Sequence, residues 1–147
     1  MSKFKERRCR ECGEGTVRLV AQQGRKAVYK LLELDVPPTL VIPTCDHCGA
    51  EWHNDDTAAA FSEAMDDAFR RELVTIAQRA LERIEQASVR QADVERAIGL
   101  SPGYLSKIKR GERTPEPALV AQLAIISMNP SARLSEAQRA WSTKLAS

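Results

Sequence analysis

Apolar residues between positions 57 and 87 recur every three or four residues, which is the spacing of one face of an α-helix. The stretch contains no glycine or proline, and the capping residues Asn54, Asp55 and Asp56 precede it. We therefore expect one long helix over residues 57–87. Its second half should pack on the helices that follow. Its first half has no assigned partner, and core packing, a dimer seam and docking of the N-terminal region all remain open.

Two shorter amphipathic segments follow in the stretch QADVERAIGLSPGYLSKIKRG, residues 91–111. Their apolar residues form two groups on either side of Gly99: Val94, Ala97 and Ile98, then Leu105 and Ile108. This pattern predicts two short helices joined by a tight glycine turn. Ser101 can cap the second helix, Pro102 suits its first turn, and Gly111 suits the residue just past its end.

The remaining segments complete an α+β pattern. Beyond residue 111 we expect a helix over 118–127, a break at Asn129-Pro130 and a last helix over 135–145. That last helix carries Ala137, Trp141 and Leu145 on one face, which closes either its own core or a two-fold interface. Near the N-terminus, polar and apolar residues alternate as in short strands over residues 16–20, 25–36 and 39–42.

The formal net charge of +2 conceals a strong segregation along the 147 residues. Residues 1–30 carry a net charge of +6, residues 31–87 of −8 and residues 88–147 of +4. The last segment is therefore basic, as DNA binding requires, while the middle would be repelled by phosphate. No apolar run approaches the roughly 20 residues that span a bilayer, and the start lacks the apolar segment of a signal peptide. We expect a cytoplasmic protein that binds no membrane.

All four cysteines lie in two identical Cys-x-x-Cys-Gly motifs, formed by Cys9, Cys12, Cys45 and Cys48. Two such motifs supply the four thiolates of a closed, tetrahedral structural site, which predicts one Zn²⁺ ion. Disulfides are less favoured in the cytoplasm, and a redox motif needs only one pair. His47 and His53 lie nearby, but four cysteines already fill the site. An all-thiolate site leaves no open position for water, so we do not expect an enzyme that uses catalytic zinc.

The stretch from Gln91 to Gly111 resembles the helix-turn-helix of the Xre/Cro repressor family, with glutamine opening the first helix and YLSKIKRG closing the second. The resemblance implies that the second helix enters the DNA major groove and that Gln91 holds a phosphate. On that helix Ser106 and Lys107 face away from the apolar residues and can reach base edges. The candidate DNA-binding residues are Gln91, Ser101, Gly103, Tyr104, Ser106, Lys107, Lys109, Arg110 and Arg113, the last three as phosphate contacts.

Glu95 departs from the pattern of that family, which has a small residue where the two helices cross. We expect its long side chain to bend outward and to alter the crossing angle.

The N-terminal motifs CRECGEG and VPPTLVIPTCDHCGAEW resemble the zinc finger of YgiT/MqsA-type antitoxins, and so does the order of finger, helix and helix-turn-helix. The resemblance implies a zinc ribbon over residues 1–56 and a DNA-binding domain over 57–147. It also implies an antitoxin that represses its own type II toxin–antitoxin operon. The finger would then bind a toxin that cleaves mRNA, and a homodimer would bind a palindromic double-stranded operator.

An alternative remains open for the same pair of modules. A stand-alone or phage-borne transcription regulator would use its zinc ribbon for dimerisation or for contact with RNA polymerase. The sequence contains no motif for the toxin-facing residues, so it does not separate the two.

Overall fold

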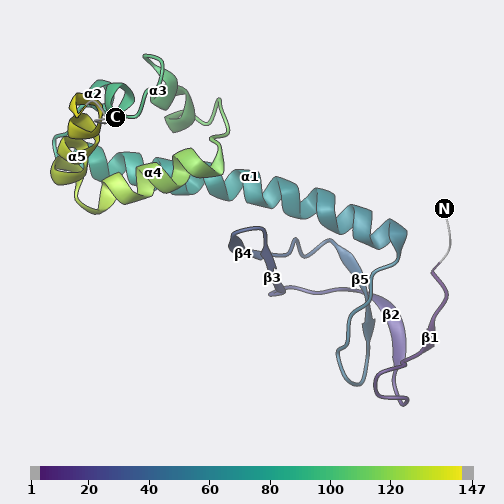
Figure 1. Ribbon diagram of the computed structural model, residues 1–147. Coiled ribbons are helices and arrows are strands. Elements are labelled where there is room, and N and C mark those ends of the chain that lie inside the picture. Colours follow the sequence, from purple (N-terminus) through teal and green to yellow (C-terminus); the bar gives the residue numbers. More distant parts are fainter. Residues whose placement is uncertain (1–3, 144–147) are drawn as a thin grey trace. The chain divides into compact units, whose positions relative to one another are not determined.

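The computed structural model describes residues 4–143 and confirms the α+β fold class (Figure 1). Within these residues a region of short strands precedes a long helix, α1 (Asp55–Gln86), and four shorter helices. The chain divides at Phe69 and Arg70 into two compact units. The modules predicted from the sequence divide at the start of α1, whereas the compact units divide inside it.

The strands of the first unit are β1 (Arg7–Arg8), β2 (Thr16–Ala21), β3 (Lys26–Tyr29), β4 (Leu32–Asp35) and β5 (Val41–Cys45). One antiparallel sheet has the order β1-β2-β5, and β3 and β4 form a separate two-stranded sheet. In the larger sheet Val17 lies opposite Arg7 on one side and Cys45 on the other. Because Cys9 follows β1 directly, this register brings the two cysteine motifs to the same end of the sheet.

The prediction of one continuous strand over residues 25–36 was wrong, because the chain reverses at Lys30 and Leu31 to form the β3–β4 hairpin. Lys30 has a φ of 54°, in the left-handed region that a chain reversal often needs. The reversal lets Tyr29 donate a hydrogen bond to Asp66 over 2.9 Å, and Lys30 lies 2.7 Å from the same carboxylate. A contact with α1 therefore holds the turn.

Arg25 is a buried cation that fastens the loop after β2 to β5. Its guanidinium donates to the carbonyl of Val20 over 2.9 Å and to Oγ1 of Thr44 over 2.7 Å. Its Nε lies 2.8 Å from Glu51 as an ion pair, without the angles of a hydrogen bond. A buried charge needs such partners, so these contacts determine the path of the loop.

Helix α1 begins with a reciprocal cap, in which the Thr57 amide donates to Oδ1 of Asn54 and the Asn54 amide donates to Oγ1 of Thr57, both over 2.8 Å. In the first unit, its residues Met65 and Phe69 are buried. The ring of Tyr29 meets Phe69 edge-on at 6.3 Å. The first half of the helix thus packs on the strand region, in agreement with the docking alternative.

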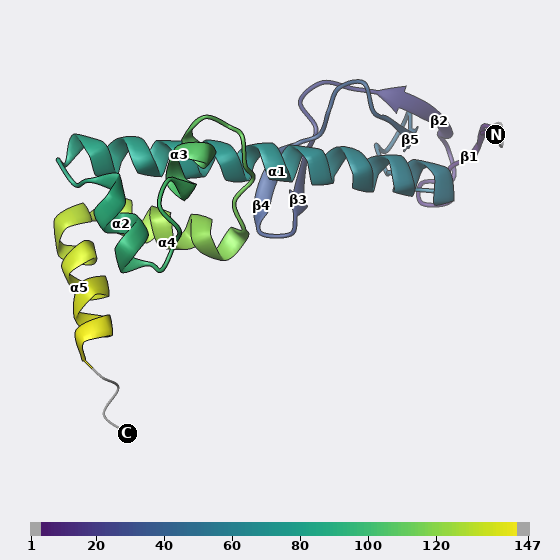
Figure 2. The same ribbon diagram turned by 90° about the horizontal axis from the view of Figure 1, so that it is seen from above.

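The second unit contains the rest of α1 with α2 (Gln91–Ala97), α3 (Tyr104–Lys109), α4 (Pro117–Met128) and α5 (Pro130–Ser142). Figure 2 shows α2, α3 and α4 gathered around the C-terminal half of α1. Its buried apolar side chains come from four helices: Leu73, Ala77, Ala80, Leu81, Ile84, Val94, Ala97, Leu105, Ile108, Leu119, Val120, Leu123 and Ile126. The predicted packing of α1 on the helix-turn-helix is thus observed.

Helix α5 begins five residues before the predicted start, because Pro130 fits the first turn of a helix and Asn129 alone makes the break. Leu145, which we expected on its apolar face, lies outside the described residues. The helix has no buried residue, and Trp141 is 70% exposed although its indole N–H donates to the carbonyl of Ala97. It therefore packs on α2 and α4 without closing a core of its own. No helix in residues 4–143 is both long enough and apolar enough to cross a bilayer.

Candidate metal centre and nucleic-acid interface

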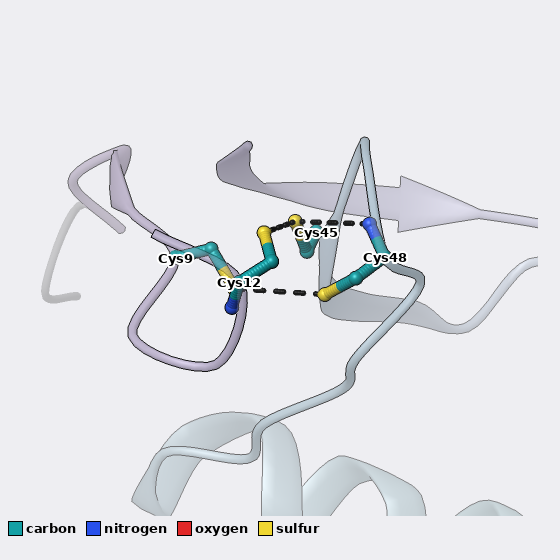
Figure 3. A group of neighbouring side chains, drawn as sticks. All are labelled: Cys9, Cys12, Cys45 and Cys48. Carbon is teal, nitrogen blue, oxygen red and sulfur yellow. Dashed lines mark hydrogen bonds between the residues drawn. The ribbon is translucent and has the colours of Figure 1, made fainter. Parts of the chain in front are cut away.

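The four cysteines converge in the first unit with their sulfur atoms all within 4.8 Å of one another (Figure 3). The Sγ atoms of Cys9 and Cys48 are 3.7 Å apart, and those of Cys12 and Cys45 are 3.8 Å apart. Two thiolates about 2.3 Å from one tetrahedral ion lie about 3.8 Å from each other, so the cluster has the dimensions of a zinc site. A disulfide bond would need about 2.05 Å. The four cysteines are therefore free thiols able to hold one metal ion.

Each Cys-x-x-Cys-Gly motif forms a tight turn, called a knuckle here. Backbone amides in both knuckles point at the sulfur atoms. In the first turn the amide of Gly15 lies 3.4 Å from Sγ of Cys12 and the amide of Cys12 lies 3.5 Å from Sγ of Cys9. In the second, the amides of His47 and Cys48 lie 3.4 and 3.5 Å from Sγ of Cys45. Hydrogen bonds to sulfur favour the thiolate, which is the form that binds metal.

Gly15 is a site residue that the sequence analysis missed. A Cβ atom at this position would overlap Sγ of Cys45 and come within 2.7 Å of Cβ of His47, so only hydrogen fits there. The glycines that end the two motifs, Gly13 and Gly49, have φ angles of 70° and 72°, in the left-handed region that tight turns use. Glycine is needed at position 15 because Cys45 and His47 of the second knuckle lie against it. The residue spacing within the first knuckle does not indicate this.

The two histidines lie outside the cluster, as we expected when four cysteines fill the site. Nε2 of His47 is 2.7 Å from a carboxylate oxygen of Glu14 at the surface. The ring of His53 packs against Phe61 with 5.0 Å between the ring centres.

The thiols have very different affinities for protons. The amides of Gly15 and Glu14 lower the pKa of Cys12 to about 6. At Cys48 the amide of Ala50 also lowers the pKa, but burial and the neighbouring thiols of Cys45, Cys9 and Cys12 outweigh it and raise the pKa to about 12. Without a cation, Cys12 is therefore a thiolate at neutral pH while Cys48 keeps its proton.

Metal binding should release protons and should weaken as the pH falls. At neutral pH the cation must displace the proton of Cys48, because the pKa of that thiol is about 12. Below the Cys12 pKa of about 6 a further proton must leave, so the affinity should fall more steeply there. Competition with a chromophoric chelator across this pH range measures the affinity, and titration in weak buffer measures the protons. An affinity independent of pH would contradict this account.

In the second unit, Glu95 turns inward, so the expectation that it bends outward was wrong. The residue is 4% exposed, and its two carboxylate oxygens accept hydrogen bonds from the amides of Leu105 over 2.9 Å and Gly103 over 3.1 Å. Amides at the start of a helix lack partners within the helix, and the positive end of the helix dipole favours a carboxylate there. Glu95 on α2 thus caps α3.

The prediction that Ser101 caps the second helix was also wrong. The helix begins at Tyr104, its N-cap residue is Gly103 with a φ of 79°, and no N-cap side chain bonds to it. Among the described residues the hydroxyl of Ser101 forms no hydrogen bond, although its carbonyl accepts one from the Tyr104 amide over 3.1 Å. Pro102 lies in the preceding turn.

Replacing Glu95 should therefore destabilise the second unit much more than replacing Ser101. Glu95→Ala leaves two amides without their charged acceptor, and we expect the free energy of unfolding to fall by roughly 2–4 kcal/mol. Ser101→Ala should change it by less than about 0.5 kcal/mol. Denaturant unfolding of the full chain followed by circular dichroism gives both values. An equal loss of unfolding free energy in the two variants would contradict the assignment of Glu95 as the main cap of α3.

The exposed face of α3 brings several candidate DNA-binding residues together. Gln91, at the start of α2, donates from Nε2 to Oγ of Ser106 over 2.6 Å. Lys107 is exposed, and its ammonium forms no hydrogen bond or ion pair within residues 4–143. Gly103, also exposed, has no side chain within this face. The exposed face of α3 therefore carries several hydrogen-bond donors, including the ammonium group of Lys107, which is unpaired within the described part of the chain.

The three residues expected to contact phosphate are engaged within the protein. Nζ of Lys109 lies 2.6 and 2.7 Å from the two carboxylate oxygens of Glu85. Arg110 forms a bidentate pair with Glu112 at 2.7 and 3.0 Å, and Arg113 stacks on the ring of Tyr104 at 4.5 Å. Exposed ion pairs contribute little to stability, so phosphate groups can compete for these cations.

Comparison with known proteins bears on this second unit. Residues 80–126 match the family model HTH_3, described as helix-turn-helix, and the match runs from the end of α1 into α4. No curated protein matches the chain. The match supports a DNA-binding transcription regulator, and the four-cysteine cluster lies outside the matched residues.

Proposed function

We propose that this protein is a sequence-specific DNA-binding transcription regulator that inserts α3 into the major groove. The observation that carries the proposal is the match of residues 80–126 to the helix-turn-helix family. In this fold the second helix of the motif approaches base edges with its N-terminal residues. The exposed Lys107 in the last turn of α3 and the half-buried Ser106 beside it support the same reading.

Individual residues have distinct roles in this proposal. Lys107 donates to O6 and N7 of guanine, and Ser106 bonds beside it. Gly103 lets the backbone approach the DNA closely. Ser101 and Tyr104, which lie near it in the sequence, contact the DNA beside it. Lys109, Arg110 and Arg113 exchange their present partners for phosphate oxygens, which adds affinity without sequence information.

We also propose that the protein binds its operator as a homodimer, with one α3 in each half of a palindrome. Helix-turn-helix dimers read half-sites about one helical turn apart. An apolar surface supports a second copy as the partner. Ile125, Met128 and Trp141 are exposed in the second unit, and a groove between α2, α4 and α5 lies beside Ile125 and Trp141. This surface does not include α3, so dimerisation there would leave the recognition helix free.

Selection from a library of randomised duplexes should enrich a palindrome, and Lys107→Ala should weaken binding to it. We expect a loss of roughly 1–3 kcal/mol and relaxed discrimination at one base pair in each half-site, because one donor pair to guanine is removed. Fluorescence anisotropy with the enriched duplex and its single-base variants measures both quantities.

The matched control is Lys26→Ala, which removes an exposed lysine of the first unit and should leave DNA binding unchanged. A uniform loss on every duplex would mean that Lys107 contacts only phosphate. If the wild-type chain enriched no duplex, the proposed function itself would be wrong.

We further propose that the protein is the antitoxin of a type II toxin–antitoxin operon and that its first unit is a zinc ribbon that binds the toxin. The fit of the cluster to a tetrahedral ion and its four thiolate ligands support zinc at Cys9, Cys12, Cys45 and Cys48. When bound, the ion cross-links the two knuckles and contributes folding energy. The resemblance of both cysteine motifs to the MqsA-type finger supports the antitoxin role.

Growth of cells that express the open reading frame next to this gene tests that role. We expect arrest that co-expression of this protein relieves. Cys45→Ser removes one metal ligand and should fail to relieve it, since the first unit loses its cross-link. Lys107→Ala should still relieve it, because that variant affects only DNA.

Two outcomes would contradict the antitoxin proposal. A harmless neighbouring product would favour a stand-alone or phage-borne regulator, whose ribbon serves dimerisation or contact with RNA polymerase. Full relief by Cys45→Ser would mean that neutralisation does not depend on the ribbon. Neither outcome would alter the proposal for α3.

A further inference from the structure

The hydroxyl of Ser106 is held by a chain of hydrogen bonds that begins at a buried carboxylate. Glu95 accepts from the amides of Gly103 and Leu105, which fixes the position of its oxygens. Nε2 of Gln91 lies 3.5 Å from Oε1 of Glu95 and 2.6 Å from Oγ of Ser106. Both Gln91 and Ser106 are half-buried, so these contacts are shielded from water.

The carboxylate determines which way the Gln91 amide faces. An ionised carboxylate only accepts hydrogen bonds, so the side of the Gln91 amide that faces Glu95 must be its nitrogen. That nitrogen has two hydrogens, and Ser106 and Glu95 take one each. Oγ of Ser106 is therefore an acceptor toward the protein interior. Among the described residues, the hydroxyl of Ser106 donates no hydrogen bond of its own.

We propose that Glu95 and Gln91 fix Ser106 as a hydrogen-bond donor to DNA, and so determine which chemical groups the start of α3 accepts. Ser106 then pairs with an acceptor: purine N7, guanine O6, thymine O4 or a phosphate oxygen. An amino group of cytosine or adenine at the same place would leave the hydroxyl hydrogen of Ser106 without an acceptor and is therefore disfavoured. The inference rests on the proposed DNA-binding function and deepens it.

Gln91 acquires a different role in this arrangement. The resemblance to Xre/Cro repressors implies that Gln91 holds a phosphate, but its two amide hydrogens already point at Ser106 and Glu95. Its effect on DNA passes through Ser106, which makes it a positioning residue. Because Lys107 also only donates, Ser106 and Lys107 together present donors alone, and guanine is the base that offers two acceptors in the major groove.

Single-group substitutions in the duplex enriched by the wild-type chain test the inference. Nucleobase analogues that lack N7, O6 or O4 remove base acceptors, and methylphosphonates remove a charged phosphate oxygen. We expect one of these changes to weaken wild-type binding roughly tenfold. Ser106→Ala should be insensitive to that same change. The position of the sensitive group separates a base edge from the phosphate backbone.

Gln91→Met tests the hydrogen-bond chain from Glu95 through Gln91 to Ser106. This variant removes the amide but keeps the length of the side chain, so Ser106 becomes free to donate or accept. We expect folding and overall affinity to persist, while the wild-type preference for an acceptor at the Ser106 position is lost. Gln86→Met makes the same chemical change at an exposed residue at the end of α1 and should behave as wild type. Circular dichroism checks that each variant is folded.

Several results would overturn the inference while leaving DNA binding intact. One is coupling of Ser106→Ala to loss of an amino group of cytosine or adenine, since Ser106 would then accept. Another is an unchanged preference in Gln91→Met, and a third is a Ser106→Ala variant that binds every duplex as wild type does. Failure of the wild-type chain to enrich any duplex would instead overturn the proposed function, and the inference with it.

Discussion

The burial of the Glu95 carboxylate is the interaction on which helix α3 depends. A buried charge costs several kcal/mol unless hydrogen bonds and a favourable field compensate for it, and the start of a helix supplies both. Helix α3 has six residues, too few to be stable by itself in water. Its position therefore depends on two attachments to its surroundings: the burial of Leu105 and Ile108, and the cap from α2. A cap that comes from the neighbouring helix also fixes the angle between the two helices.

A polar centre also organises the first unit. Around the cysteine cluster the buried residues are Cys9, Val17 and Cys45, with Phe4, Cys12 and Trp52 partly buried against them. The apolar packing around the cluster is small and contributes little folding energy there, and a metal ion that links four thiolates would add to it. In the metal-free state burial and the neighbouring thiols of Cys45, Cys9 and Cys12 outweigh the amide of Ala50 and raise the pKa of Cys48, so that thiol keeps its proton. Four thiolates this close repel one another unless a cation lies between them. Each unit thus depends on a few polar atoms that must all be satisfied together.

Much of this structure follows from local spacing, which a single sequence contains. The cysteine motifs predicted the cluster, and the apolar spacing predicted α1, α2 and α3, because ligands of one knuckle and residues of one helix face lie within a few positions of each other. The failures share a different cause. The reversal at Lys30 depends on Asp66, 36 positions away, and Gly15 is constrained by Cys45. The inward turn of Glu95 depends on backbone amides, which have no signature in a pattern of side chains.

The charges around α3 bear on how the proposed regulator would distinguish its operator from other DNA. Nonspecific attraction to DNA grows with the number of cations that replace counterions on phosphate. Here Glu85 holds Lys109 and Glu112 holds Arg110, so two of the cations near α3 are partly neutralised before DNA arrives. The same pairing with Arg110 lowers the pKa of Glu112, which keeps that carboxylate ionised. In the proposed complex this pairing would reduce the sequence-independent affinity, while Lys107 and Ser106 would keep their capacity to donate. A surface of this kind favours discrimination between sites over tight binding to any one of them.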